Sequence, residues 1–522
     1  MIGFVYGAGL GSVCGWSMKV WTRGMPPPGI SVCEKRKKNR IVLCSSSLEH
    51  AKTTEDNSSD QTIAENYHAK STVRSYVRNP DERMQPAGRE ALELELQVRR
   101  LDEHEAGSCR KAMLNGSNLD TRAVHGGERD KGGIKARAVL DAITTPVSQS
   151  ATFTFRNSRE CIEYNEGLYE SFEYGRYGNP TTRSAEEKLM LLEGAEDALL
   201  SSSGMNSVTT MLLALVPSGG HIVVTTDCYR RTRQFVQTLL PKMGIRCTVL
   251  DPADIVGLQS ILESDGADLY FSESPTNPMI RVVDVDKIAE LCNKHNTLCC
   301  IDTTFATAFN FRPIEHGAHL VLHSGTKYLA GHNDVLCGAL AGRADLIGEV
   351  RKLHGILGGV LDPHSAYLLL RGMKTLGLRI EQQNKTAATV AQFLDSHPKI
   401  SRVHYPTLPS HPDYETAKDQ FGERGGFGGV LSFEMRGNGD PWSRETFEAA
   451  NRFVDALRIP YIGPSLGGVE SLVEQVCIMG YYDQPLETRK ALGINNGFIR
   501  FACGIENTDD VIADISAALE AV

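Results

Sequence analysis

The fold is decided by the stretch His319-Leu-Val-Leu-His-Ser-Gly-Thr-Lys327-Tyr-Leu-Ala-Gly-His332. Its first half is an apolar run of strand length, and its second half supplies small hydroxyl residues and one lysine. A strand that ends in Ser324-Gly-Thr326-Lys327 places two hydroxyls and an amine at the carboxyl edge of a sheet, where open α/β folds bind ligands. A lysine withdrawn from water there loses its proton more easily and can attack a carbonyl group. The stretch predicts a lysine bonded covalently to its ligand beside two phosphate-binding hydroxyls; the alternative is an ordinary lysine after a buried strand.

Length and composition limit the class of protein. The chain has 522 residues, too many for one hydrophobic core, so two or more domains are expected. The hydrophobic fraction of 41% and the charged fraction of 23% are typical of a globular protein. A formal net charge of −9 argues against a nucleic-acid partner. Because no apolar run reaches the roughly 18 residues of a membrane-spanning helix, we expect no membrane partner either.

The cysteines predict a reducing compartment. The 13 cysteines are scattered without a Cys-x-x-Cys pair, and several lie in apolar runs, such as Cys299 and Cys300. Such residues are typical of buried, reduced thiols. The sequence also lacks the His-Glu-x-x-His motif and other zinc-ligand spacings, so we expect no metal site.

The amino terminus differs from the rest of the chain. Its first 46 residues hold seven basic residues and one acid, and they lead into Cys44-Ser-Ser-Ser47. This composition is typical of an organelle transit peptide. A secretory signal is the alternative, but residues 1–18 lack a basic start and a continuous apolar run. Residues 48–115 are polar, with one charged helix expected near Arg89 to Glu105, so we interpret 1–120 as transit peptide and disordered linker.

From about Ala185, short apolar runs alternate with segments long enough for crossover helices. Most of the runs are continuous rather than alternating, as in strands buried on both faces of a parallel sheet. They predict a doubly wound α/β domain over residues 184–384. The expected strands are Asp197–Ser201, His221–Thr225, Cys247–Leu250, Leu269–Ser272, Leu298–Asp302 and His319–His323, with a further strand at Cys337–Ala341.

A smaller α+β domain is expected over residues 385–522. Helical segments at Thr386–His397 and Ser443–Leu457 alternate there with strand-like Val430–Phe433 and Phe498–Ala502. A helix through Arg371–Asn384 would join the two domains. The glycine cluster at 425–429 lacks the strand-then-helix setting of a dinucleotide-binding motif, so we interpret it as a turn or a close backbone approach.

Four further positions are candidates for binding. The segment Ser201-Ser-Ser-Gly204-Met205-Asn206 follows a strand and opens a helix, so its free N–H groups predict a phosphate cradle opposite the hydroxyls of the lysine stretch. Asp302 ends an apolar strand and can hold a protonated pyridine nitrogen, or cap the next segment. Tyr229 can stack on a planar cofactor, or simply fill core or surface space. Arg500 lies among apolar residues and needs a carboxylate partner from the protein or from a substrate.

Two local motifs allow more than one interpretation. The loop Tyr174-Gly-Arg176-Tyr-Gly-Asn-Pro180 is rich in glycine and aromatic residues, and by itself it indicates only a turn. Ser324-x-x-Lys327 also matches the serine–lysine motif of penicillin-recognising enzymes. The Ser-Asp-Asn and Lys-Thr-Gly motifs of those enzymes are absent from this chain, so we set that interpretation aside.

Taken together, these motifs resemble the transsulfuration family of pyridoxal-phosphate enzymes over roughly Arg122 to Val522. Within the family the chain is most similar to the plant cystathionine γ-synthases, as Thr225–Arg230, Leu240–Ile245, Ile356–Gly359 and Ile459–Gly467 indicate. The family motifs are Tyr174-x-Arg176 with Gly178-Asn-Pro180, Ser203-Gly-Met205, Glu273-Ser-Pro-Thr-Asn277-Pro, Asp302-Thr-Thr-Phe305, Ser324-Gly-Thr-Lys327 and Arg371-Gly-Met-Lys-Thr-Leu376.

The resemblance implies the fold-type-I architecture and a role for each motif. Lys327 would bind pyridoxal 5'-phosphate covalently and later move protons, Asp302 would keep the pyridine nitrogen protonated, and Tyr229 would stack on the ring. Arg500 would bind the substrate α-carboxylate. The phosphate would be held by Gly204, Met205, Ser324 and Thr326, and from a neighbouring subunit, through an arm at 121–183, by Tyr174 and Arg176. The resemblance also implies that Asn277 and Ser465 line the site.

The implied reaction joins an activated homoserine and L-cysteine to give L-cystathionine, in methionine biosynthesis, in a homotetramer built as a dimer of dimers in the plastid stroma. The expected substrate is O-phosphohomoserine, because Pro464 stands where users of acylated homoserine often carry Glu. Arg231 could add a cation for the phosphate, or be a solvated arginine. The alternatives are a cystathionine or methionine γ-lyase of the same family and, more remotely, a non-catalytic scaffold.

The chain departs from the plant pattern in three ways. Thr303 and Gly325 stand where Gly and Ala are expected, and Arg231 stands where Lys is expected. The amino-terminal regulatory stretch of the land-plant enzymes is not evident, which bears on feedback control rather than on catalysis.

Overall fold

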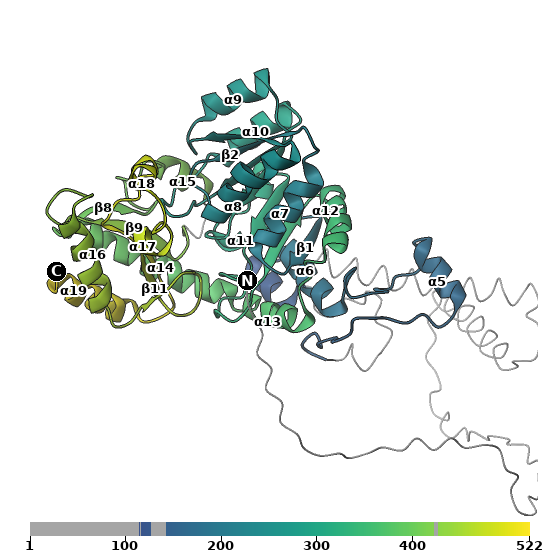
Figure 1. The fold of residues 1–522 in the computed structure, drawn as a ribbon. Helices are drawn as coiled ribbons and strands as arrows, with labels where there is room; N and C mark the ends of the chain where they lie inside the picture. The colour runs from purple at the N-terminus through teal and green to yellow at the C-terminus, as the bar shows by residue number, and fades with distance from the viewer. Residues whose placement is uncertain (1–113, 115, 127–141, 422–425) are drawn as a thin grey trace, which may run out of the picture. The chain divides into compact units, whose positions relative to one another are not determined.

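The computed structural model describes residues 114, 116–126, 142–421 and 426–522 (Figure 1). The chain divides into two units, Met1–Gly88 and Arg89–Val522, and every described residue belongs to the second. The expected charged helix near Arg89 to Glu105, and nearly all of the expected transit peptide and linker at 1–120, lie outside the described residues.

A seven-stranded sheet organises the larger domain, in the order β1-β7-β6-β5-β4-β2-β3. Strands β3, β2, β4, β5 and β6 run parallel, whereas β7 runs antiparallel to both of its neighbours, β6 and β1. Each expected strand is present with its ends within one residue of the prediction. The strands are β1 Asp197–Ser201, β2 His221–Thr225, β3 Arg246–Leu250, β4 Leu269–Glu273, β5 Leu298–Asp302, β6 Leu320–His323 and β7 Gly338–Gly342.

Both faces of this sheet are covered, which explains the continuous apolar runs. Along β2, the side chain of Val223 packs in one cluster with Ile288, while Val224 packs in another with Met211 and Ile347. A strand covered on both faces has no solvent side, so polar alternation disappears. The helices of this part are α3 Leu119–His125, α5 Ser158–Asn165, α6 Pro180–Glu193, α7 Gly204–Leu215, α8 Arg230–Gln234, α9 Ile255–Ser264, α10 Val285–Lys294, α11 Thr307–Asn310, α12 Ala344–Leu357 and α13 Pro363–Met373.

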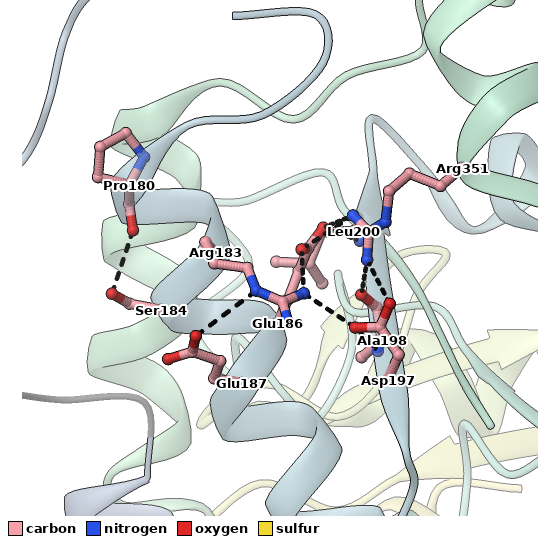
Figure 2. Close-up of polar contacts among 9 residues, drawn as sticks. All are labelled: Pro180, Arg183, Ser184, Glu186, Glu187, Asp197, Ala198, Leu200 and Arg351. Atoms are coloured by element: carbon pink, nitrogen blue, oxygen red, sulfur yellow. Dashed lines mark hydrogen bonds and ion pairs between the residues drawn. The ribbon is translucent and has the colours of Figure 1, made fainter. Parts of the chain in front are cut away.

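Two arginines fix the edge strand β1 to helices α6 and α12 (Figure 2). Arg183 of α6 donates to Asp197 Oδ1 at 2.9 Å, and Arg351 of α12 donates to Asp197 Oδ2 at 3.0 Å. Arg351 also binds Glu186 at 3.1 Å, and Glu186 accepts the backbone N–H of Leu200 at 3.1 Å. This network holds the strand that leads directly into the start of α7, where the phosphate cradle is expected.

The carboxyl-terminal part forms the expected smaller α+β domain around a five-stranded sheet, in the order β10-β11-β12-β9-β8. The helix expected at Ser443–Leu457 is α16, and the Ser443 side chain caps it by accepting the Thr446 N–H. The strands are β8 Ile400–His404, β9 Val430–Met435, β10 Tyr461–Ile462, β11 Leu472–Gln475 and β12 Phe498–Ala502. The helices are α14 Leu376–Asp395, α15 Tyr414–Gln420, α16 Arg444–Ala456, α17 Val476–Met479, α18 Leu486–Ala491 and α19 Thr508–Glu520.

The structure corrects the helices expected at Arg371–Asn384 and Thr386–His397. Residues 371–373 end α13, and one continuous helix, α14, covers most of both expected segments, so the expected domain boundary at 384/385 falls inside it. The polar run there does not end the helix because tertiary contacts satisfy it. The buried Gln383 side chain donates to the Gly468 carbonyl at 2.7 Å, and Asn384 exchanges hydrogen bonds with Asn310.

The described part of the glycine cluster, residues 426–429, is a close backbone approach, as predicted. Gly428 has a φ of 90°, in the left-handed region that favours glycine, and a Cβ there would collide with the Phe305 carbonyl. The Gly429 N–H donates to the Tyr328 hydroxyl at 2.9 Å. The cluster therefore packs against the residue that follows Lys327.

Candidate active site

A cavity of about 540 Å³ opens at the carboxyl ends of β4, β5 and β6, and residues of the carboxyl-terminal domain form its other wall. Tyr174 and Arg176 do not line it. The lining includes the other eleven predicted site residues, which are Gly204, Met205, Tyr229, Arg231, Asn277, Asp302, Ser324, Thr326, Lys327, Ser465 and Arg500.

The amine of Lys327 is prepared for chemistry. Burial and the nearby Arg500 guanidinium lower the pKa of Lys327 to about 8, against an opposing effect of Glu474. The Lys327 Nζ donates to Ser465 Oγ at 2.6 Å. Ser465 has a φ of 97°, a conformation that non-glycine residues rarely adopt and that the surrounding structure must hold. A lysine with such a pKa supplies a usable fraction of neutral amine near neutral pH.

Two carboxyl groups, the buried Glu273 and the half-buried Asp302, lie on neighbouring strands. Asp302 of β5 is in register with Glu273 of β4. Burial raises the pKa of both groups, and the negative charge of Asp302 raises that of Glu273 further. Asp302 Oδ1 accepts two hydrogen bonds from Thr304, at 2.9 Å from the backbone N–H and at 2.5 Å from the hydroxyl. Two acids in one buried place favour a bound cation, and a protonated pyridine nitrogen is one.

Glu273 is not among the residues predicted for the site, although it begins one of the family motifs. Its Oε1 accepts the Tyr229 N–H at 2.5 Å and its Oε2 accepts the Asn277 N–H at 3.2 Å. One carboxylate therefore fixes the loop of the expected stacking residue and the loop of an expected substrate-binding residue. The signal that could have found it is the one that found Asp302, a carboxylate at the end of a buried strand.

Glu474 is the second residue that the sequence reasoning missed. It is buried and forms an ion pair with Arg500 at 3.2 Å. Arg500 also donates to Asn277 Oδ1 at 3.1 Å and to the Ser465 carbonyl at 2.9 Å. The required carboxylate partner of Arg500 is thus a protein acid. Because Arg500 also lines the cavity, a substrate carboxylate remains a second partner that the geometry allows.

The two segments of the predicted phosphate cradle, the start of α7 and the Ser324 loop, lie against one another. A Cβ at Gly204 would lie 3.1 Å from the Cβ of Ser324, which is tighter than most Cβ contacts, so glycine favours the close approach of the two loops. The Ser203 side chain caps α7 by accepting the Asn206 N–H at 3.1 Å. The Thr326 hydroxyl is engaged with the backbone of Cys337, accepting its N–H at 2.9 Å and donating to its carbonyl at 3.2 Å.

Cys337 also explains the glycine found at position 325. A methyl group on Gly325 would lie 2.9 Å from the Cys337 sulfur, which is closer than real Cβ contacts come. Glycine at 325 therefore leaves room for the side chain of Cys337.

The mouth of the cavity carries Tyr229 and Arg231. Tyr229 lines the cavity with 46% of its surface exposed, so it does not serve as core filling. Arg231 is exposed and donates to Gln234 Oε1 at 2.8 Å on its own helix, while it also lines the cavity.

Tyr174 and Arg176 belong to a loop that contacts a different part of the chain. The Arg176 guanidinium donates to the Gly355 carbonyl at 2.7 Å, near the end of α12. It lies over two aromatic rings, 5.3 Å from the ring centre of Tyr174 and 5.0 Å from that of Tyr177. These rings are 41% and 49% exposed. The chain therefore does not bring this loop into its own cavity.

Three further observations concern the described residues only. They contain no cluster of three or more His, Cys, Asp or Glu residues that could hold a metal ion. Their nine cysteines are all free thiols. None of the helices that they form is both long and apolar enough to span a bilayer.

Comparisons with known proteins agree with this geometry. The Cys/Met metabolism PLP-dependent enzyme family model matches residues 120–520. Cystathionine gamma-synthase 1, chloroplastic, of Arabidopsis thaliana is 53% identical over 399 residues, which cover 76% of this chain and 68% of that protein. Cystathionine beta-lyase of Lactococcus lactis subsp. cremoris is 35% identical over 77% of this chain and 99% of the lyase. The crystal structure of metB from Corynebacterium glutamicum superposes with a TM-score of 0.69 at 31% identity, over 78% of this chain and 99% of that one.

Proposed function

We propose that this chain joins O-phosphohomoserine and L-cysteine to give L-cystathionine and phosphate. The chain belongs to the Cys/Met metabolism PLP-dependent enzyme family. The similarity to a plant cystathionine γ-synthase at 53% identity carries the choice of reaction, since the lyase is only 35% identical. The reaction is a γ-replacement in methionine biosynthesis, and its substrates are small molecules.

The cofactor is pyridoxal 5'-phosphate, and the residues of the cavity fit it. Lys327 offers an amine that loses its proton near neutral pH. The half-buried Asp302 lines the cavity and offers a carboxyl group to a ring nitrogen. The start of α7 offers free backbone N–H groups to a phosphate where Gly204 approaches Ser324. When bound, pyridoxal phosphate supplies an electron sink that makes the α and β protons of the substrate removable.

The residues of the chain then divide the remaining work. Arg500, held by Glu474 and Asn277, binds and orients the substrate α-carboxylate. Lys327 removes and returns protons at the α and β carbons, because its pKa of about 8 lets one amine act as base and then as acid. The Ser465 hydroxyl, 2.6 Å from the amine, keeps Nζ directed into the cavity.

The γ substituent is a phosphate because the mouth of the cavity offers positive charge. Pro464 and Arg231 both line the cavity. Arg231 contributes a positive charge, and Pro464 adds no negative charge that would repel a phosphate. A charge-assisted contact to phosphate contributes about 1.5–3 kcal/mol, or roughly tenfold or more in affinity. Arg231→Ala should therefore lower kcat/KM for O-phosphohomoserine about tenfold and leave the KM for cysteine nearly unchanged. Wild-type preference for the succinyl ester would refute the substrate, and an unchanged mutant would refute the role of Arg231.

Incubation with L-cysteine and O-phosphohomoserine, followed by detection of cystathionine, tests the reaction. A γ-lyase would instead split cystathionine or methionine faster than it forms cystathionine. A non-catalytic scaffold would bind the cofactor and do neither.

The plastid is the proposed location. The Arabidopsis relative is named chloroplastic, and the basic, acid-poor leader of this chain suits import. We expect cleavage after import somewhere in the region of residues 46–75. A fluorescent protein fused to residues 1–75 should enter plastids, and cytosolic fluorescence would contradict the assignment. Within the stroma, the enzyme is proposed to be a homotetramer of active dimers.

A further inference from the structure

We propose that Arg230 is a specificity-determining residue at the mouth of the cavity, where it binds the anionic γ substituent of the homoserine substrate. The carboxylate of Asp483 binds Arg230 and competes with that anion for the guanidinium. This inference rests on the proposed function and deepens it, because it names a second cation, beside Arg231, that distinguishes an anionic from a neutral leaving group.

The geometry of Arg230 is that of an anion-binding fork. Its two terminal nitrogens donate to the two oxygens of Asp483, both at 3.0 Å, and one of them also donates to the Gly480 carbonyl. Parallel donors in one plane fit a phosphate as well as a carboxylate. Arg230 and Gly480 both line the cavity, so the fork lies at its edge rather than on remote surface.

The Asp483 carboxylate is held weakly enough to be exchanged. Its side chain is 62% exposed, whereas that of Arg230 is 27% exposed. Exposed ion pairs are weak because water screens them, so a dianionic phosphate competes well against a single solvated carboxylate. Arg500 differs, since its partner Glu474 is only 8% exposed and two further acceptors from Asn277 and Ser465 fix its guanidinium.

Arginines therefore line the cavity at two separate places: Arg500 at one, and Arg230 with its neighbour Arg231 at the mouth. Arg500 comes from β12 of the smaller domain, and Arg230 comes from the start of α8 in the larger domain. A homoserine that carries a carboxylate at one end and a phosphate at the other could bind Arg500 with the carboxylate and Arg230 with the phosphate. Glu273 accepts a hydrogen bond from the backbone N–H of Tyr229, the expected ring-stacking residue. Arg230 directly follows Tyr229, so this hydrogen bond also fixes the backbone next to Arg230.

The test compares kcat/KM for O-phosphohomoserine and O-acetylhomoserine, whose acetyl group is neutral. Arg230→Ala should lower the value for the phosphorylated substrate about tenfold or more and that for the acetyl substrate less than about threefold. Arg230→Lys should restore part of the loss. Asp483→Asn removes the competing anion and should raise the value for the phosphorylated substrate about two- to fivefold, with little effect on the acetyl substrate.

An exposed arginine–aspartate pair elsewhere provides the control. Arg343 binds Asp345 through the same two-pronged contact, at 3.1 and 2.6 Å, and neither residue lines the cavity. Arg343→Ala and Asp345→Asn should leave kcat/KM unchanged for both substrates. Inhibition by inorganic phosphate gives a second readout, and its inhibition constant should rise in Arg230→Ala and fall in Asp483→Asn.

Two results would overturn the inference. An equal loss of kcat/KM for both substrates in Arg230→Ala would show that Arg230 has a structural role and does not determine specificity. A loss on the phosphorylated substrate in Asp483→Asn, as large as in Arg230→Ala, would make the pair a required bridge rather than a displaceable one. Failure of the proposed function looks different, because the wild type would then form no cystathionine or would prefer the acetyl substrate.

Discussion

The inner end of the cavity and the loop Tyr174–Tyr177 each contain an arginine, but the two arginines differ in burial and in the partners that they bind. At the inner end, Arg500 and Glu474 are each less than 10% exposed and bind one another. In the loop, Arg176 rests on two half-exposed rings and one backbone carbonyl.

The difference indicates which part of the site one chain can complete. A buried charge without a partner is strongly destabilising, so the inner end must be matched inside the chain. An exposed arginine among aromatic rings meets no such requirement, and exposed aromatic and arginine side chains are enriched where subunits meet. We therefore expect the inner end to act within its own subunit and the loop to act across a subunit interface, as proposed for the phosphate of the cofactor.

The largest effect is expected at the inner end, for Lys327→Ala. Loss of the covalent attachment and of the acid–base group should lower turnover about 10³-fold or more. The absorption of covalently bound cofactor should disappear as well. Lys352→Ala, which removes an exposed lysine paired with Glu349, serves as the control and should leave both measurements unchanged. Full activity of Lys327→Ala would contradict the assignment of Lys327 as the residue that binds the cofactor covalently.

Glu273→Gln should have the next largest effect. The amide keeps one acceptor oxygen but turns an NH₂ group toward the backbone N–H of Tyr229 or Asn277, so one of the two loops loses its anchor. A lost hydrogen bond to a charged group is worth about 1.5–3 kcal/mol, so kcat/KM should fall roughly ten- to a hundredfold. Cofactor dissociation should become measurably faster if the Tyr229 loop moves. Unchanged kinetics and cofactor binding would show that Glu273 positions neither residue.

The pKa of Lys327 predicts how cofactor attachment depends on pH. Only the neutral amine attacks a carbonyl, and the pKa is lowered to about 8. In cofactor-free protein, the rate of covalent attachment should therefore fall about tenfold for each pH unit below 8 and level off above it. Stopped-flow absorbance would measure this rate. An inflection near the ordinary lysine value of about 10.4 would contradict the effect of burial and Arg500.

Mixed dimers test the loop, with the smallest expected signal. Arg176→Ala and Lys327→Ala subunits are each inactive as homodimers if Arg176 serves the neighbouring site. In a mixed dimer, one site keeps Lys327 and receives an intact Arg176 from its partner. Random pairing of equal amounts should recover about a quarter of wild-type activity, because about half the dimers are mixed and each has one intact site. No recovery, with mixed dimers confirmed by native mass spectrometry, would place Arg176 in its own subunit.

The sequence by itself determined the parts that depend on local pattern. Continuous apolar runs located each strand of the larger sheet to within one residue at its ends, because a strand buried on both faces needs apolar residues at successive positions. Polar residues at strand ends then located Asp302 and the Lys327 stretch, since parallel strands deliver their carboxyl ends to one edge. Family resemblance supplied the roles.

Only the tertiary structure decided which distant residues meet. The helix α14 is continuous because Asn384 forms a hydrogen bond with Asn310 and Gln383 forms one with the Gly468 carbonyl. The tertiary structure also gave Arg500 the partner Glu474, and it joined Arg230 to Asp483, 253 residues away. Periodicity records which face of an element is buried, but it carries no information on which remote side chain lies opposite. Pairing of that kind depends on how the two domains pack around the cavity.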